Sequence, residues 1–231
     1  MKTPDKSPLE RISFQHIFRQ LLQVLNLEKG LGYTVKWLVI NPHKAIYEYL
    51  YENRNRMIKP FAFVVLVAAV ATYLTVTFIF KGDDLLQQLH ADPDWDTVPE
   101  RLQLVIERLM IMTQKYFNLS YLSSIPFIAL ATFWVFKEDG LNFAEHLVIN
   151  CYLYCMQSII LILMIPALAL WAETGLVSAG LLLGYQVYAY SRIFEVGWLE
   201  GLGKTLLVQV VTAVFSAIIL TIFALVVFNQ A

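Results

Sequence analysis

A glutamate and a histidine stand side by side at Glu145 and His146, where a long apolar stretch begins. Histidine exchanges protons near physiological pH, and ionisable groups at membrane depth often serve function. One hypothesis is therefore a proton or ligand site at the inner mouth of a helical bundle. The alternative is structural. Asn142 as N-cap and Glu145 at the third helical position form a capping-box-like pair, while His146 sits at the membrane interface.

The following turns offer few further catalytic or ligating groups. His146 and Asn150 share one helical face, and so do Cys151 and Cys155. A metal site would need more cysteine or histidine ligands from other apolar stretches, which hold none. We interpret the two cysteines as small buried apolar residues. No nucleophile adjoins a candidate base, so the sequence predicts no enzyme, no metal ion and no cofactor.

Residues 201–205 read Gly-Leu-Gly-Lys-Thr and are similar to the end of a phosphate-binding loop. That motif needs a glycine at position 198, where this chain has Trp198, and no strand precedes the segment. We therefore expect no nucleotide binding. Lys204 is interpreted as an inner-face anchor for the last apolar stretch.

Uncharged polar side chains occur in the last three apolar stretches: Gln157, Ser158, Tyr185, Gln186, Tyr188, Tyr190, Gln209, Thr212 and Ser216. They predict either hydrogen bonds between helices or a polar path. The absence of acids and bases deep in these stretches argues against an ion-coupled pump. Gly180 and Gly184 have the small-xxx-small spacing that lets a helix approach closely, within one chain or between two copies of a homo-oligomer.

Five apolar stretches must position these groups: 61–80, about 118–136, about 146–171, about 175–191 and about 205–228. Each is long enough for a hydrocarbon core of roughly 30 Å. The chain is 58% apolar and 15% charged, whereas a soluble domain has about 25% charged residues. The predicted fold class is an all-α integral membrane protein with five transmembrane helices, occupying residues 61–231.

Residues 1–60, called the foot below, form a separate cytoplasmic segment of amphipathic helices. Apolar residues between 9 and 25 recur at helical spacing, which predicts a helix on the membrane surface or a short packed helix. Glu28-Lys29-Gly30 should break it, and a second helix should run from about 31 to 40. Asn41 as N-cap and Pro42 at the first position predict a third helix to about Glu52.

The foot ends in a basic collar of Arg54, Arg56 and Lys59. Ten lysines and arginines precede the first apolar stretch, and positive charge favours the cytoplasmic side. We therefore expect a multi-pass protein of the bacterial cytoplasmic (inner) membrane, with a cytoplasmic amino terminus and an external carboxyl terminus. The loop at 81–117 would be external. It is acidic at first and amphipathic from Pro99, which predicts a helix on the outer leaflet or packed over the bundle.

Three blocks together resemble a known family. They are Glu28-Lys29-Gly30 to Thr34 with Asn41-Pro42 and Lys59-Pro60-Phe61, then Ala144 to Val148, then Tyr188 to Lys204. Over about residues 10–228 the chain resembles the uncharacterised bacterial membrane family DUF3667. Many members begin with a Cys-x-x-Cys zinc ribbon, which this chain lacks. Members often carry histidines after the Glu-His pair, where this chain has Cys151 and Tyr152. The resemblance implies no known activity.

The layout is also similar to that of Yip-type five-span proteins, which implies membrane organisation and partner binding rather than catalysis. Our leading hypothesis is accordingly a non-enzymatic adaptor or scaffold. Its foot would dock a protein partner or the anionic lipids of the bilayer, and a net charge of −1 leaves no field to attract nucleic acid. The alternative is a small-molecule or lipid transporter or channel with a polar path between the last three apolar stretches.

Overall fold

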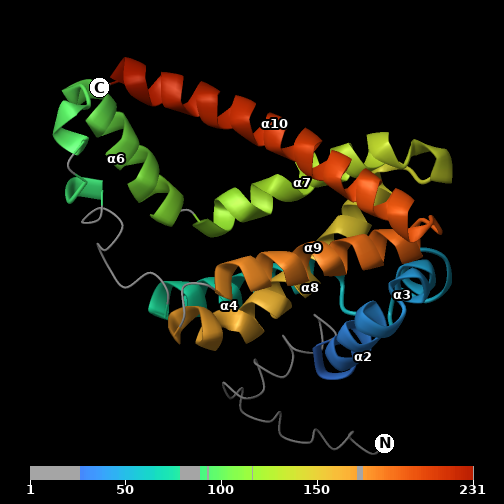
Figure 1. Cartoon of the computed structure of the whole chain (residues 1–231). Helices are drawn as coiled ribbons and strands as arrows, with labels where there is room; N and C mark the ends of the chain where they lie inside the picture. Colours follow the sequence, from blue (N-terminus) through green and yellow to red (C-terminus); the bar gives the residue numbers. More distant parts are fainter. Residues whose placement is uncertain (1–26, 79–88, 93, 116, 171–173, 231) are drawn as a thin grey trace, which may run out of the picture.

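The computed structural model describes residues 27–78, 89–92, 94–115, 117–170 and 174–230, and this part of the chain is all-helical (Figure 1). Its eight α-helices are α2 (Leu27–Ile40), α3 (Pro42–Tyr47), α4 (Pro60–Phe78), α6 (Glu100–Lys115), α7 (Phe117–Val135), α8 (Phe143–Leu170), α9 (Thr174–Ile193) and α10 (Trp198–Gln230). The surface helix expected between 9 and 25 lies outside the described residues.

The five helices α4, α7, α8, α9 and α10 coincide with the five predicted apolar stretches, within a few residues at most ends. Phe143–Leu168 and Trp198–Ile218 are long and apolar enough to cross a bilayer, and Pro60–Thr75 and Leu122–Val135 are shorter apolar segments. Two long and two shorter apolar helices suggest a membrane location. α7 and α8 continue through Pro126 and Pro166.

α8 is the central helix of the bundle. It contacts α4, α7 and α9, and α10 closes the bundle by packing against α7 and α9. In Figure 1, α10 runs obliquely away from α9 toward its carboxyl end, where it meets α6. The core between these helices contains large fully buried side chains, among them Tyr152, Tyr190, Phe63 and Phe136.

The foot departs from the prediction at its first helix. The expected break at Glu28-Lys29-Gly30 is wrong, because α2 begins at Leu27 and continues through Gly30. The start of α3 is confirmed: Asn41 is the N-cap, its side chain accepts the Lys44 amide at 3.1 Å, and Pro42 follows. The expected helix to Glu52 continues as a π-helical turn, Glu48–Glu52.

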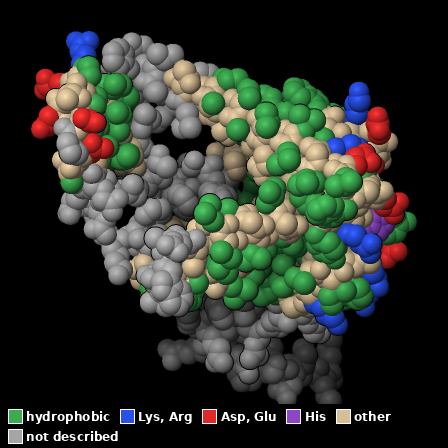
Figure 2. Space-filling model, in the orientation of Figure 1, with side chains coloured by type: hydrophobic (Ala, Val, Ile, Leu, Met, Phe, Trp, Pro, Cys, Tyr) green, Lys and Arg blue, Asp and Glu red, His purple; other side chains and the backbone are tan. Residues whose placement is uncertain are grey.

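Charged and apolar surfaces are separated along the molecule. Figure 2 shows charged side chains gathered around α3 and over α6, with a broad apolar face between them along α9 and α10. Leu176, Val210 and Val214 are among the exposed side chains of that face. The amphipathic helix predicted from Pro99 is confirmed as α6, which contacts α7 and α10 and buries Val105.

Candidate functional site

Hydrogen-bonding side chains of α7, α8 and α9 meet near the ends of these helices that face the foot, called the inner ends below. The Asn150 side chain donates to the Thr132 hydroxyl at 2.8 Å and to the His146 carbonyl at 2.8 Å. Its carbonyl oxygen accepts the Tyr190 hydroxyl at 2.9 Å. All four side chains are buried. Asn150 therefore joins three helices and leaves none of its own polar atoms unpaired.

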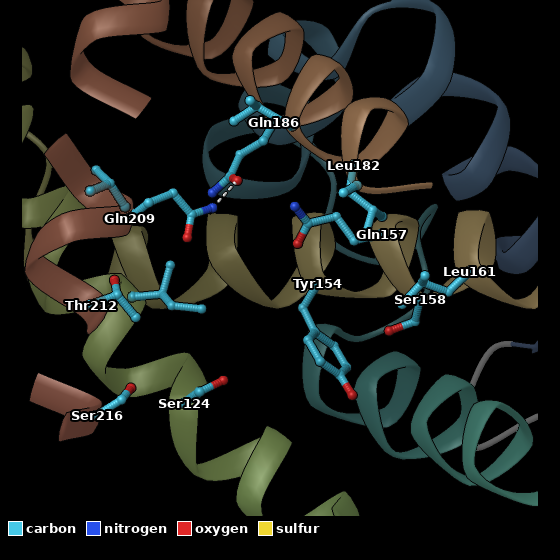
Figure 3. Close-up of a pocket in the computed structure, with 14 residues that line it drawn as sticks. Ser124, Tyr154, Gln157, Ser158, Leu161, Leu182, Gln186, Gln209, Thr212 and Ser216 are labelled. Atoms are coloured by element: carbon cyan, nitrogen blue, oxygen red, sulfur yellow. Dashed lines mark hydrogen bonds between the residues drawn. The ribbon is translucent and has the colours of Figure 1, made fainter. Parts of the chain in front are cut away.

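The chain of hydrogen bonds continues to a fourth helix. Gln186 Nε2 donates to the Tyr190 hydroxyl at 3.3 Å, and Gln209 Nε2 donates to Gln186 Oε1 at 2.6 Å (Figure 3). His146 on α8 is thus linked to Gln209 on α10. The predicted hydrogen bonds of Gln186, Tyr190 and Gln209 are confirmed, whereas sequence reasoning missed Thr132.

His146 is fully buried among the helices, and its place at the membrane interface stays a prediction. Its ring stacks on Phe194 at 5.5 Å and meets Phe133 edge-on at 5.7 Å. Nδ1 lies 3.2 Å from the Thr132 hydroxyl, which already donates to the Ala129 carbonyl. Nδ1 must therefore carry the proton, and Nε2 is a buried acceptor without a partner among the described residues.

Glu145, although adjacent, belongs to a different structure. The Asn142 amide donates to Glu145 Oε2 at 2.7 Å, and the Glu145 amide donates to Asn142 Oδ1 at 3.0 Å. This reciprocal pair confirms the predicted capping box at the start of α8. Glu145 Oε1 also accepts the Tyr51 hydroxyl of the foot at 3.2 Å. Burial, followed by the charge of Glu145, raises the pKa of Tyr51.

A cavity of about 510 Å³ lies between α7, α8, α9 and α10 (Figure 3). Its polar lining residues are Ser124, Tyr154, Gln157, Ser158, Gln186, Gln209, Thr212 and Ser216. None of the described residues that line it is charged. The Thr212 hydroxyl is buried without a hydrogen-bond partner in the described part of the chain. The cavity therefore offers uncharged donors and acceptors, one of them unpaired.

The cavity lies deep in the bundle. At 1.5 Å per residue, Gln186 lies about 10 Å from the inner end of α9, and Ser216 about 27 Å from the inner end of α10. The buried Tyr190, whose hydroxyl accepts from the cavity residue Gln186, packs on the stacked rings of Phe136 and Phe194, whose centroids are 3.9 Å apart.

A second hollow, of about 340 Å³, opens on the inner side of Phe194. It is lined by residues of the foot and of the two inner loops, including Tyr47, Tyr51, Asp139 and Glu195. Burial raises the pKa of Asp139, and the nearby Lys204 opposes this shift. Phe194 thus forms part of this inner hollow and also packs on His146.

The residues of the basic collar differ in their partners. Arg56 pairs at 3.2 Å with Glu48, a buried carboxylate that also accepts the Tyr33 hydroxyl at 2.6 Å. Burial, followed by the hydrogen bond to Glu48, raises the pKa of Tyr33. Arg54 donates to a backbone carbonyl within its own turn. All three collar residues are exposed, and Arg56 is the one that pairs with a buried carboxylate.

The glycines and cysteines of the bundle have distinct surroundings. A Cβ added at Gly180 or Gly184 would meet no atom within 4 Å, so none of the described helices packs closely on these two glycines. Helix contact is instead close at Gly201, inside α10. Cys151 and Cys155 are buried, as predicted. Among the described residues, no group of three histidine, cysteine or acidic side chains could hold a metal ion.

Residues 28–72 match the model of a family described as a protein of unknown function (DUF3667). The match covers most of α2, all of α3 and the larger part of α4. It confirms the resemblance to that family over this segment. No curated protein and no solved structure matches the chain.

Proposed function

We propose that this chain, which matches DUF3667 in its first helices, is a carrier in the bacterial cytoplasmic membrane for an uncharged polar small molecule or the polar part of a lipid. The ligand would occupy the cavity between α7 and α10. The five helices α4, α7, α8, α9 and α10 would span the bilayer, with the foot in the cytoplasm and the carboxyl terminus outside.

The separation of surfaces supports the membrane placement. An apolar face along α9 and α10 lies between two charged ends (Figure 2). An apolar surface this broad is costly in water but suits hydrocarbon. The capping box at Glu145 and the exposed collar residues lie at the end that carries the foot, where the positive-inside rule places the cytoplasm.

The cavity is the observation that carries the proposal. Its volume of about 510 Å³ falls in the usual range for small-molecule sites. A charged ligand would lose its hydration there without meeting a counter-charge among the described lining residues, which is costly. A neutral molecule with donors and acceptors could instead bond to the amides of Gln157 and Gln209 and to the Thr212 hydroxyl.

The layer on the inner side of the cavity supports carriage rather than static binding. Tyr190, Phe136 and Phe194 would close the route to the inner hollow. The Tyr190 hydroxyl accepts a hydrogen bond from Gln186, a side chain that lines the cavity. A ligand that competes for Gln186 would disturb the hydrogen bonds that hold this layer. Ligand binding and opening of the inner route would thereby be coupled.

An adaptor remains the second candidate, and a specific surface favours it. The described part of the foot is docked on the bundle and exposes Tyr47, Tyr51, Lys44 and Arg54 toward the inner side. Tyrosine and arginine are common at the centres of protein interfaces. A cytoplasmic partner could bind this rigid surface while the cavity serves another step or none.

Replacement of Thr212 by valine tests the carrier proposal. This change removes the unpaired hydroxyl without breaking a hydrogen bond of the described structure, so folding should be preserved. Small molecules that co-purify from native membranes in mild detergent would be identified by mass spectrometry. We expect a neutral compound at near one per chain, reduced roughly tenfold by Thr212→Val, which corresponds to about 1.4 kcal/mol.

Val210→Leu is the matched control, because Val210 is exposed on the outer face of the same helix. It should leave the amount of bound compound unchanged. A cavity that carries no compound, or equal loading in wild type and Thr212→Val, would contradict the carrier proposal. A stoichiometric protein partner lost on Tyr47→Ala or Tyr51→Ala would favour the adaptor instead.

A further inference from the structure

A groove of about 520 Å³ lies at the inner end of the bundle, where α9 ends, α10 begins and α2 joins α3. Its lining includes His43, Arg192, Glu195 and Trp198. It shares no lining residue with the cavity between α7 and α10. It is therefore distinct from that cavity, adjoins the hollow beside Phe194 through the shared His43 and Glu195, and lies at the level where lipid headgroups would be.

The groove presents one cation and one anion. Arg192 is exposed and makes no ion pair or hydrogen bond with any residue that the structure describes. Glu195 is 76% exposed, and its Oε1 lies 3.7 Å from His43 Nε2. An anionic ligand would be attracted by Arg192 and repelled by Glu195. A ligand that carries both signs fits the pair better.

The His43 ring and the Glu195 carboxylate together can accept a further hydrogen-bond donor. His43 Nδ1 lies 3.3 Å from the Ile193 carbonyl oxygen, which can only accept, so Nδ1 carries a proton. In the neutral ring, Nε2 then turns a lone pair toward the Glu195 carboxylate, and two acceptors face each other. An N–H donor from a ligand would relieve this arrangement. A primary ammonium group has hydrogens enough to bond both.

The rim of the groove is apolar. Trp198 is 67% exposed, Leu199 next to it is 75% exposed, and Ile40 at the end of α2 is also exposed. Tryptophan is enriched where a membrane protein meets the headgroup layer. Acyl chains attached to a headgroup in the groove would find this apolar surface beside them.

We infer that this groove binds a phosphatidylethanolamine-type lipid of the inner leaflet. Its phosphate pairs with Arg192, its primary ammonium lies between His43 and Glu195, and its acyl chains follow Trp198 along α10. The inference rests on the membrane placement proposed above and is independent of the ligand in the cavity.

The test uses the full chain in nanodiscs made from equal parts of phosphatidylethanolamine, phosphatidylcholine and phosphatidylglycerol. Lipids retained after transfer to mild detergent are counted by native mass spectrometry. We expect phosphatidylethanolamine to be retained several-fold over the other two. Arg192→Gln should reduce retention of all phospholipids about tenfold, the scale expected for one charged hydrogen bond. Glu195→Gln should abolish only the preference for phosphatidylethanolamine over phosphatidylcholine.

Arg101→Gln and Glu100→Gln are the controls, because both residues are exposed on α6, at the opposite end. They should leave lipid retention unchanged. Equal retention of the three lipids, preference for phosphatidylglycerol, or a normal preference in Glu195→Gln would overturn the inference. Alkaline carbonate extraction of native membranes separates the two failures. Release of the chain by carbonate would contradict the proposed membrane placement. A chain that stays in the membrane but shows no lipid preference would contradict only the headgroup site.

Discussion

Gly201 is a residue at which α9 and α10 come into close contact. A Cβ at this position would overlap the Ser191 hydroxyl of α9, so only glycine fits without displacing that side chain. The Ser191 hydroxyl is itself buried and has no hydrogen-bond partner among the described residues. The crossing of α9 and α10 is therefore set by the absence of a side chain at one position.

Gly201→Ala should lower the thermal stability of the detergent-purified chain, because the added methyl group must push the Ser191 side chain aside. Overpacking of this kind costs about 1–3 kcal/mol. The measurement is the midpoint of unfolding by intrinsic tryptophan fluorescence. Gly203→Ala is the matched control, since a Cβ there meets no atom within 4 Å and should be neutral or stabilising.

Ser191→Ala in the Gly201→Ala background should restore part of the loss by removing the displaced hydroxyl. Equal midpoints for Gly201→Ala and Gly203→Ala would show that the α9–α10 crossing relaxes freely. From sequence, Gly201 could be assessed only as part of a glycine-rich segment. Its packing role depends on Ser191, which is brought to it by the turn between α9 and α10.

At the scale of elements, tyrosines of α9 hold the described foot against the bundle. The last carbonyls of any helix lack partners within that helix. Here the Tyr188 hydroxyl lies 3.2 Å from the Val39 carbonyl and 2.8 Å from the Ile40 carbonyl, and the Tyr185 hydroxyl donates to the Leu38 carbonyl at 3.3 Å. Side chains of a bundle helix thus satisfy the end of α2.

Tyr188→Phe should loosen this end of the foot while leaving the bundle folded. The lost hydrogen bond is worth about 0.5–1.5 kcal/mol, so amide exchange over residues 36–41 should accelerate by roughly threefold to tenfold. Hydrogen exchange read by mass spectrometry measures this directly. Tyr47→Phe serves as control, because Tyr47 is exposed and its described contacts are ring contacts only. Unchanged exchange at α2 in Tyr188→Phe would argue that apolar packing alone docks the foot.

Sequence predicted the elements better than their contacts. The five long helices follow from runs of apolar residues, and the start of α3 follows from Asn41-Pro42, because both signals are local. The docking of α2 joins residues almost 150 positions apart, and no local pattern specifies such a pair. Gly30 did not end its helix, which shows that helix propensity is a weak signal when tertiary packing competes.

At the scale of the whole molecule, the proposed topology gives a direct prediction. Single cysteines at Glu52 and Asp96, both exposed, should lie on opposite sides of the membrane. In spheroplasts, an impermeant maleimide should label Asp96→Cys at once and Glu52→Cys only after permeabilisation. The native Cys151 and Cys155 are buried and should contribute little background. Labelling in the reverse order would show the orientation opposite to the proposed one. Labelling of both sites from outside would show that α4, between them, does not span the membrane.

The candidate site, like the helices, could be predicted only in part from the sequence. Polar residues in the last three apolar stretches predicted hydrogen bonds between helices or a polar path; the structure shows hydrogen bonds between helices, and the polar path stays a prediction. The bonds from Asn150 to Gln209 occupy the inner part, and the cavity occupies the deeper part. The sequence could not show that Glu145 and His146 have different surroundings. Adjacent residues of a helix point in different directions, so one can face solvent while the next faces the core.

The length of α10 has a mechanical consequence. Its 33 residues extend for about 50 Å, and its uncharged stretch from Thr205 to Phe228 alone measures about 36 Å. In the proposed membrane placement, a hydrocarbon layer of roughly 30 Å would not contain that stretch upright, so the helix would lean by about 30° or thicken the bilayer around it. A tilted helix separates from its neighbours at one end. Membrane thickness would thereby set how widely α10 and α9 diverge, and with it the width of the side entrance through which a lipid-dissolved molecule could pass.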